Sequence, residues 1–141
     1  AGVSFVFWSN TGDSTSERQP LSRVGYEVGR SYIRITGSER LYLKTDTDQV
    51  SYSYIMSHGD GNWHMYTVVC DSGTMRYYLD TTLLDISSGP TITGNLTVDT
   101  ISAANTNTDF EGTLANLRIY ENRALSQTDI TGLHTLGRFW L

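Results

Sequence analysis

Paired acidic residues are the first chemistry to test in this chain of 141 residues. Retaining hydrolysis of a sugar bond needs two carboxylates about 5.5 Å apart, one acting as nucleophile and the other as acid. Residues i and i+2 of a strand point the same way and lie roughly 6.5 Å apart. The close acidic pairs are Asp46/Asp48, in a turn-like segment, and Asp109/Glu111, where a strand begins. Neither forms a Glu-x-Asp-x-x-Glu or Glu-x-x-x-Glu signature, so we predict that the protein is not an enzyme.

The three histidines do not suggest catalysis either. His58 falls in a loop, His64 in a strand and His134 in a terminal helix. Neither a His-x-x-x-His pair nor a Ser-His-Asp order can be argued from them. We therefore predict no catalytic residue, and we interpret His64 as a structural residue beside Trp63.

Oxygen-bearing loop residues raise the alternative of a calcium site. Ca²⁺ takes six to eight oxygen ligands from carboxylates, amides and carbonyls. The candidate ligands are Asp60, Asn62, Asp109 and Glu111. The competing interpretation is that these are solvated, unpaired turn residues, because the chain lacks the dense acidic spacing of an EF-hand. Calcium stays open as an alternative, and no cofactor is certain.

Aromatic rings next to polar groups offer a third chemistry, the stacking of sugars. Two tyrosines alternate with serines on one strand, and an arginine and a tyrosine share the polar face of a hairpin. We predict that these four residues form a ligand-binding patch: Tyr52, Tyr54, Arg76 and Tyr78. The alternative for the first two is that they pack in the core with their hydroxyls at its edge. Tyr77, on the other face of the hairpin, is predicted to be a core residue.

A β-hairpin is predicted to position these residues. Residues 63–70 are rich in aromatic and β-branched types, Asp71-Ser72-Gly73 supplies a turn, and residues 74–80 return with strict alternation. Because both faces of the outgoing strand are apolar, we expect it in the middle of a sheet. We expect Met75, Tyr77 and Leu79 to share a face with the odd-numbered residues of that strand.

The rest of the chain predicts an all-β fold. Strand candidates lie at 3–8, 21–28, 31–35, 41–43, 50–56 and 91–101. Ser126 and Asp129 form a capping box that begins a short helix, Ile130 and Leu133 give this helix an apolar edge, and Gly137 ends it. About a dozen short strands and one terminal helix indicate two antiparallel sheets packed face to face.

The amino-acid composition excludes several classes of binding partner. A net charge of −5 argues against nucleic acid and anionic membranes as partners. No apolar run approaches the roughly 20 residues of a membrane helix. The single cysteine, Cys70, excludes an internal disulfide and is interpreted as a small core residue. Abundant Ser, Thr, Asn and Gly with nine Tyr suit an extracellular protein or one on the surface of a virus particle.

Two stretches carry a resemblance to a known family. Residues 63–80 resemble the central hairpin of laminin-G-like domains, although Cys70 and Thr81 depart from its usual pattern. Residues 110–126 resemble the end of these domains almost continuously, with Asn116 in place of the usual acid. The resemblance implies the concanavalin A-like jelly roll of the lectin/glucanase superfamily, with residues 1–141 as one domain.

The family also suggests a feature of the N-terminal side. Laminin-G-like domains carry one or two strands before the strand that we place at 3–8, so their absence here would leave an unpaired edge. Such an edge would be covered by the rest of a longer chain or by a neighbouring subunit.

Taken together, these features predict a non-catalytic surface-recognition module. The favoured ligand is a glycan, which would make the protein a lectin, and a surface protein is the other expected partner. The competing hypothesis is a structural decoration protein of a viral capsid or another surface assembly, in which the sandwich self-associates. Both hypotheses place the protein outside the cell or on a virion.

Overall fold

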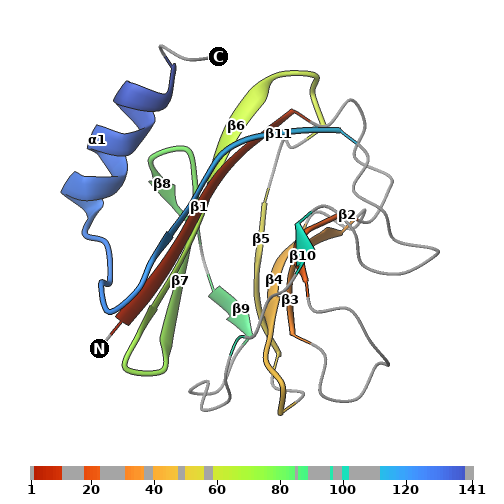
Figure 1. Cartoon of the computed structure of the whole chain (residues 1–141), viewed down its shortest axis with the longest axis vertical. Helices are drawn as coiled ribbons and strands as arrows, with labels where there is room; N and C mark the ends of the chain where they lie inside the picture. Colours follow the sequence, from red (N-terminus) through yellow and green to blue (C-terminus); the bar gives the residue numbers. More distant parts are fainter. Residues whose placement is uncertain are drawn as a thin grey trace.

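Two antiparallel sheets lie face to face, and one helix covers the outside of one of them (Figure 1). The computed structural model describes residues 2–10, 18–22, 31–36, 40–47, 50–55, 59–84, 86–88, 96, 100–101 and 112–138. The predicted β-sandwich with a short C-terminal helix is confirmed.

The five-stranded sheet has the order β11-β1-β6-β7-β8. Its strands are β1 (Gly2–Asn10), β6 (Trp63–Asp71), β7 (Thr74–Leu79), β8 (Thr82–Leu83) and β11 (Thr113–Tyr120). The central place predicted for the outgoing strand of the hairpin is confirmed, because β6 is the third of the five. Its neighbours β1 and β7 cover both of its edges.

The six-stranded sheet has the order β10-β2-β3-β4-β5-β9. Its strands are β2 (Arg18–Ser22), β3 (Tyr32–Thr36), β4 (Arg40–Lys44), β5 (Val50–Tyr54), β9 (Ile86–Ser88) and β10 (Thr100–Ile101). The strand expected at 21–28 matches β2 only at its first two residues, since 23–28 lie outside the described part. The expected 91–101 matches β10 only at its end.

The main core lies between the sheets. It contains Phe5 and Phe7 of β1, Ile33 and Ile35 of β3, and Tyr66, Val68 and Tyr77 of the hairpin. The rings of Phe7 and Tyr66 stack with their centroids 5.2 Å apart. Tyr77 is fully buried, as predicted, and its burial raises the pKa of its hydroxyl above the usual value.

The turn between β6 and β7 differs from the predicted one, and this changes which residues of the two strands share a face. Asp71 pairs with Thr74, so the turn contains only Ser72 and Gly73, whose φ angles are 52° and 82°. Two residues with positive φ are typical of a type I′ turn. Met75 therefore lies opposite Cys70, and Tyr77 opposite Val68. The expected match between odd-numbered residues was wrong, because a turn shorter by one residue exchanges the faces of the return strand.

Helix α1 (Gln127–Gly137) packs on the outer face of the five-stranded sheet (Figure 1). The predicted capping box is confirmed: the Ser126 hydroxyl accepts a hydrogen bond from the Asp129 N–H, and the Asp129 carboxylate accepts one from the Ser126 N–H. At 11 residues, the helix is too short to cross a membrane, and no other helix in the described ranges could do so.

A second apolar cluster lies beneath the helix. It consists of Val6, Trp8, Met65, Val69, Tyr78, Leu125 and Ile130. Gly137, the last residue of the helix, lies directly on Trp8, and a Cβ added to this glycine would be 2.5 Å from the indole Nε1. The close approach requires a glycine here, so Gly137 both ends the helix and lets it contact the sheet.

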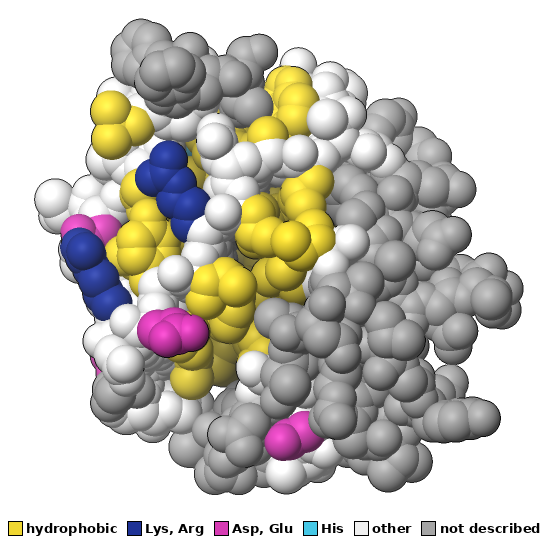
Figure 2. Space-filling model, in the orientation of Figure 1, with side chains coloured by type: hydrophobic (Ala, Val, Ile, Leu, Met, Phe, Trp, Pro, Cys, Tyr) yellow, Lys and Arg dark blue, Asp and Glu magenta, His cyan; other side chains and the backbone are white. Residues whose placement is uncertain are grey.

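Strand β11 forms one edge of the five-stranded sheet. Because β1 pairs with both β6 and β11, the N-terminal strand itself is flanked on both sides. Ile119 of β11 is 45% exposed, and hydrophobic side chains gather on the face of the molecule that carries this strand (Figure 2). Among the described strands, none pairs with the outer edge of β11. The neighbouring subunit expected at an unpaired edge stays a prediction.

Candidate functional site

A row of tyrosines and cations covers the outer face of the six-stranded sheet. We call these seven residues the cation–tyrosine face: Tyr32, Arg34, Arg40, Tyr42, Lys44, Tyr52 and Tyr54. They alternate along β3, β4 and β5 with buried residues, such as Ile33, Leu43 and Ser53, that point toward the core. Because successive side chains of a strand point to opposite faces, this alternation directs all seven outward.

Strand register brings the seven into neighbouring positions. Arg34 lies opposite Tyr42, and Tyr42 lies opposite Tyr52 on the next strand. Arg40 lies opposite Tyr54 in the same way. Directly opposed residues on one face of an antiparallel sheet have Cβ atoms about 5 Å apart, close enough for their side chains to interact.

Three of the tyrosine rings form a continuous row. The rings of Tyr42 and Tyr52 stack with centroids 4.9 Å apart and an angle of 29° between their planes. Tyr52 meets Tyr54 edge to face at 6.1 Å and 88°. Tyr54 is 48% exposed and Tyr52 half-buried, so both lie on the outer surface rather than in the core. The row offers aromatic surface to a ligand.

Arg40 holds this row together. Its guanidinium carbon lies 4.9 Å from the centroid of the Tyr52 ring and 5.1 Å from that of Tyr54. Its Nη1 donates a hydrogen bond to the Tyr42 hydroxyl and its Nη2 donates one to the Tyr54 hydroxyl, both at 3.1 Å. These hydrogen bonds raise the pKa of Arg40 further above its already high usual value, so the group is a permanent cation.

Two further cations extend the face along β3 and β4. The Arg34 guanidinium lies 5.0 Å from the Tyr32 ring centroid and 5.4 Å from that of Tyr42. The Lys44 ammonium lies 5.7 Å from the Tyr32 ring centroid. Strands β3, β4 and β5 contain these three cations and no acidic residue. The chain as a whole is acidic, whereas the charged residues of these three strands are all positive.

The predicted patch of four residues is divided between the two sheets. Tyr52 and Tyr54 belong to β5, whereas Arg76 and Tyr78 belong to β7 of the other sheet. Tyr78 is 3% exposed and packs in the cluster beneath α1, so it cannot line a surface patch with the first two. Arg76 lies 3.8 Å from the Asp71 carboxylate. The grouping was wrong because α1 covers the face of β7 that looked polar in the sequence.

Five members of the cation–tyrosine face were missed by sequence reasoning. They are Tyr32, Arg34, Arg40, Tyr42 and Lys44. The signal was present in the alternation of polar and apolar residues at 32–36 and 40–44. The sequence did not show that these two segments pair with each other and with 50–54.

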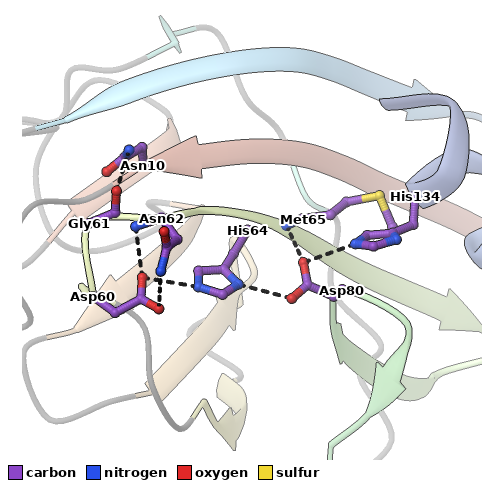
Figure 3. A network of polar contacts seen from close by, with 8 residues as sticks. All are labelled: Asn10, Asp60, Gly61, Asn62, His64, Met65, Asp80 and His134. Carbon is purple, nitrogen blue, oxygen red and sulfur yellow. Dashed lines mark hydrogen bonds and ion pairs between the residues drawn. The ribbon is translucent and has the colours of Figure 1, made fainter. Parts of the chain in front are cut away.

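Two of the calcium candidates, Asp60 and Asn62, lie in the loop before β6. The Asp60 carboxylate accepts hydrogen bonds from the backbone and side-chain N–H groups of Asn62, both at 2.8 Å (Figure 3). The side-chain bond and then the backbone bond to Asn62 lower the pKa of Asp60. The Asn10 side chain also donates to the Gly61 carbonyl at 2.8 Å. Asp60 and Asn62 thus lie in a compact turn, where they are paired with each other rather than unpaired.

The other two calcium candidates, Asp109 and Glu111, lie outside the described residues. Within the ranges that the structure describes, His, Cys, Asp and Glu side chains do not come together in a group of three or more that could hold a metal ion. Calcium at Asp60 and Asn62 therefore stays a prediction.

His64 connects this loop to the rest of the five-stranded sheet. Its Nε2 lies 3.2 Å from the Asp60 carboxylate and its Nδ1 lies 2.9 Å from that of Asp80 (Figure 3). Asp80 also accepts a hydrogen bond from the Met65 N–H at 2.9 Å and lies 3.4 Å from His134 of α1. Since carboxylates occupy both nitrogens of His64, neither can activate a nucleophile. The geometry supports the structural interpretation of this histidine.

The same contacts predict a dependence of stability on pH. Burial of the His64 ring lowers its pKa, but the hydrogen bonds and charges of Asp80 and Asp60 together outweigh burial, and the net pKa is raised above 6.5. A raised pKa in the folded state adds stability that is full below the unfolded value and is lost as pH rises through the folded value. We expect urea denaturation to show that the stability advantage of the native chain over His64→Gln shrinks between about pH 6 and 8.

The control for this prediction is His134→Gln at the same pH values, since His134 contacts Asp80 at a longer distance. Asp60 does not complicate the window, because the stability from its lowered pKa is lost only in acid. A constant difference between the native chain and His64→Gln across the window would contradict the charged state that we assign to His64.

Comparison with known proteins gives one family match. A laminin G family model, described as the concanavalin A-like lectin/glucanases superfamily, matches residues 1–131. No curated protein sequence matches the chain significantly.

Solved structures share the fold at low sequence identity. The carbohydrate-binding module CBM40 of the Ruminococcus gnavus IT-sialidase has a TM-score of 0.71 and 11% identity over 94% of this chain and 82% of its own. Domain 4 of the arabinanase AbnA from Geobacillus stearothermophilus has a TM-score of 0.67 and 16% identity, covering 94% of this chain and 66% of its own. Domains LG4-5 of the mouse laminin alpha1 chain have 0.63 and 11%, with 90% and 37% covered. At these identities, the likeness is one of fold.

Proposed function

Because the chain belongs to the concanavalin A-like lectin/glucanase superfamily, we propose that it is a non-catalytic recognition module that binds glycans through the cation–tyrosine face. The observation that carries the proposal is the row formed by Tyr42, Tyr52 and Tyr54 on the outer face of the six-stranded sheet. Aromatic side chains provide apolar surface with a polar hydroxyl at the tip, which suits the mixed surface of a sugar.

The hydrogen bonds of the face add donors to the rings. The Tyr42 and Tyr54 hydroxyls accept hydrogen bonds from Arg40, so the O–H hydrogen of each can be donated to a ligand. A few fixed polar groups around an apolar surface are typical of small-ligand sites. Arg40 also fixes the rings through its contacts with both Tyr52 and Tyr54, which reduces the entropy that binding would cost.

Structures with the same fold are consistent with this proposal. The Ruminococcus gnavus module has been solved bound to α2,3 sialyllactose, and the AbnA domain in complex with arabinotriose. The receptor-binding domain of botulinum neurotoxin type G also shares the fold, with a TM-score of 0.61 and 16% identity over 96% of this chain and 38% of its own. These ligands belong to those proteins, and fold alone does not transfer them.

The non-catalytic part of the proposal rests on the carboxylates. The sequence lacks the paired acidic signature of retaining glycosidases, and strands β3, β4 and β5 place no carboxylate on the proposed binding face. Turnover of any bound oligosaccharide would contradict it.

Binding should depend on the exposed rings. We expect Tyr52→Ala and Tyr54→Ala each to weaken glycan binding about fivefold to tenfold, because each removes a stacking surface worth about 1 kcal/mol. A glycan array would identify the ligand, and calorimetry would measure the affinities. Leu83→Ala is the matched control, since Leu83 is 53% exposed on β8 of the other sheet.

Two outcomes would contradict the proposal. If no glycan binds on the array, the protein does not recognise glycans. If both tyrosine variants keep the native affinity, the cation–tyrosine face is not the binding site.

Repeating the array with a chelator tests the calcium candidates. Binding that is lost in the chelator and restored by Ca²⁺ would support a calcium ion near Asp60 and Asn62.

The outer edge of β11 favours a second candidate function. A structural protein of a capsid or another surface assembly could pair this edge with a neighbouring copy, and the exposed Ile119 would be covered in that contact. Sedimentation of the purified chain tests this candidate: a stable oligomer without glycan binding would favour it. Either function would place this one-domain module outside the cell or on a virion surface.

A further inference from the structure

The positive charge of the cation–tyrosine face indicates the charge of the ligand, which the aromatic row alone does not. Resting on the proposed function, we infer that the ligand is an acidic sugar whose carboxylate is bound by Arg40. A neutral sugar needs only rings and neutral donors, whereas this face has three cations and its strands have no acidic residue.

Some of the N–H groups of Arg40 make no hydrogen bond within the protein. A guanidinium carries five N–H groups. The contacts of Arg40 are those with the Tyr42 and Tyr54 hydroxyls and with the Tyr52 and Tyr54 rings, and its Nε has no hydrogen-bond partner. One N–H therefore remains on each of Nη1 and Nη2. These remaining donors can pair with the oxygens of a carboxylate, an acceptor that arginine favours.

The position of Arg40 is also fixed before a ligand arrives. The guanidinium lies over two rings and is hydrogen-bonded at both terminal nitrogens, so its rotamers are already restricted. The phenol hydroxyls beside it can donate to the same carboxylate or to neighbouring sugar hydroxyls. A carboxylate at Arg40 would thus sit within a ring of donors, with the sugar ring on the exposed tyrosines.

Arg34 and Lys44 have a supporting role. Both have further contacts of their own, so they are less suited to an anchoring contact than Arg40. Both cations lie beside the tyrosine rings, and interactions between exposed charges extend over about 10 Å at moderate salt.

The alternative is that Arg40 only stiffens the tyrosine row. In that case, the guanidinium would order the rings for a neutral sugar and would not touch the ligand. This alternative predicts that removing the charge would weaken acidic and neutral sugars equally. The two roles can therefore be separated by sugars that differ in one carboxylate.

The test uses matched pairs of sugars. The first pair is 3′-sialyllactose and lactose, and the second is methyl glucuronide and methyl glucoside. Affinities would be measured by NMR titration for the native chain, Arg40→Gln and Arg40→Lys. The control is Arg76→Gln, which removes a half-buried arginine from the other sheet. A melting curve for each variant checks that it is folded.

We expect at least one acidic member to bind about tenfold or more tightly than its neutral partner, because a charge-assisted pair is involved. Arg40→Gln should abolish this preference, Arg40→Lys should retain part of it, and Arg76→Gln should leave it unchanged. The acidic member should also lose affinity as sodium chloride is raised, because salt screens exposed charges.

Other results would overturn the inference. Equal binding of both members of each pair, or an equal loss of both in Arg40→Gln, would show that Arg40 does not read the carboxylate, while the proposed glycan function would stand. No binding of any sugar on the array would instead overturn the proposed function and this inference with it.

Discussion

Replacing Trp8 with alanine is expected to lower the free energy of unfolding by about 3–5 kcal/mol. Trp8 is 3% exposed and lies in the cluster beneath α1. Its indole stacks on the His134 ring, with the ring centroids 5.2 Å apart, and also contacts Gly137. One side chain of the sheet therefore packs against two residues in the C-terminal part of the helix. Alanine would leave a cavity that the glycine cannot fill.

Chemical denaturation followed by circular dichroism measures this effect. Trp8→Phe is the matched control, since it keeps an aromatic ring at the site, and we expect it to cost about 1–2 kcal/mol. A loss below about 1 kcal/mol in Trp8→Ala would contradict the role that we give to this contact. The folded fraction of the variant should bind its glycan as the native chain does, because Trp8 and the cation–tyrosine face belong to different sheets.

Asp80→Ala is expected to cost about 2–4 kcal/mol, the second largest effect. The Asp80 carboxylate accepts the N–H of Met65, a fully buried residue, and an unpaired buried N–H costs about 1–3 kcal/mol. Asp80 also has a φ of 55°, where alanine is disfavoured by roughly 1 kcal/mol. The lost contact with His64 adds to both costs.

Asp80→Asn separates these contributions. Asparagine keeps an oxygen for the Met65 N–H and tolerates positive φ, but it removes the charge that faces His64 and His134. We expect it to lose less than half of the stability lost in Asp80→Ala, as measured by urea denaturation. Equal losses in the two variants would show that the charge, rather than the hydrogen bond and the backbone, accounts for the effect.

Local sequence signals predicted the local structure well. The hydroxyl of Ser126 and the carboxylate of Asp129 are close in the chain, so their capping box depends on few other residues. The hairpin likewise follows from the β-branched run of 63–70 and the glycine at its turn. Tyr77 was assigned to the core correctly because its strand alternates without interruption.

The errors arose where structure depends on distant parts of the chain. The length of the turn at Ser72-Gly73 decides the faces of β7, and Asp71 could have belonged to the turn or to the strand. The burial of Tyr78 depends on α1, which lies about 50 residues later and packs on that face. No periodicity within β7 contains that information.

The candidate site shows the same limit. Tyr52 and Tyr54 were identified from their own strand, but their partners Arg40 and Tyr42 lie on β4. Only the register between strands brings the four together, and a sequence without related sequences does not reveal the register. The sequence likewise did not show that the calcium candidate Asp60 contacts His64, because His64 was visible only as a strand residue.

The two outer surfaces of the sandwich face in opposite directions, and β1 and α1, the first and last described elements, both belong to the side of the five-stranded sheet (Figure 1). Tethering the protein to a bead or a sensor chip by either end would therefore turn the tyrosines of β4 and β5 toward the solution. Many copies displayed in this orientation would engage a many-branched glycan together, and such multivalent avidity can exceed the single-site affinity by roughly a hundredfold or more. Weak recognition by one copy would then be enough for firm adhesion.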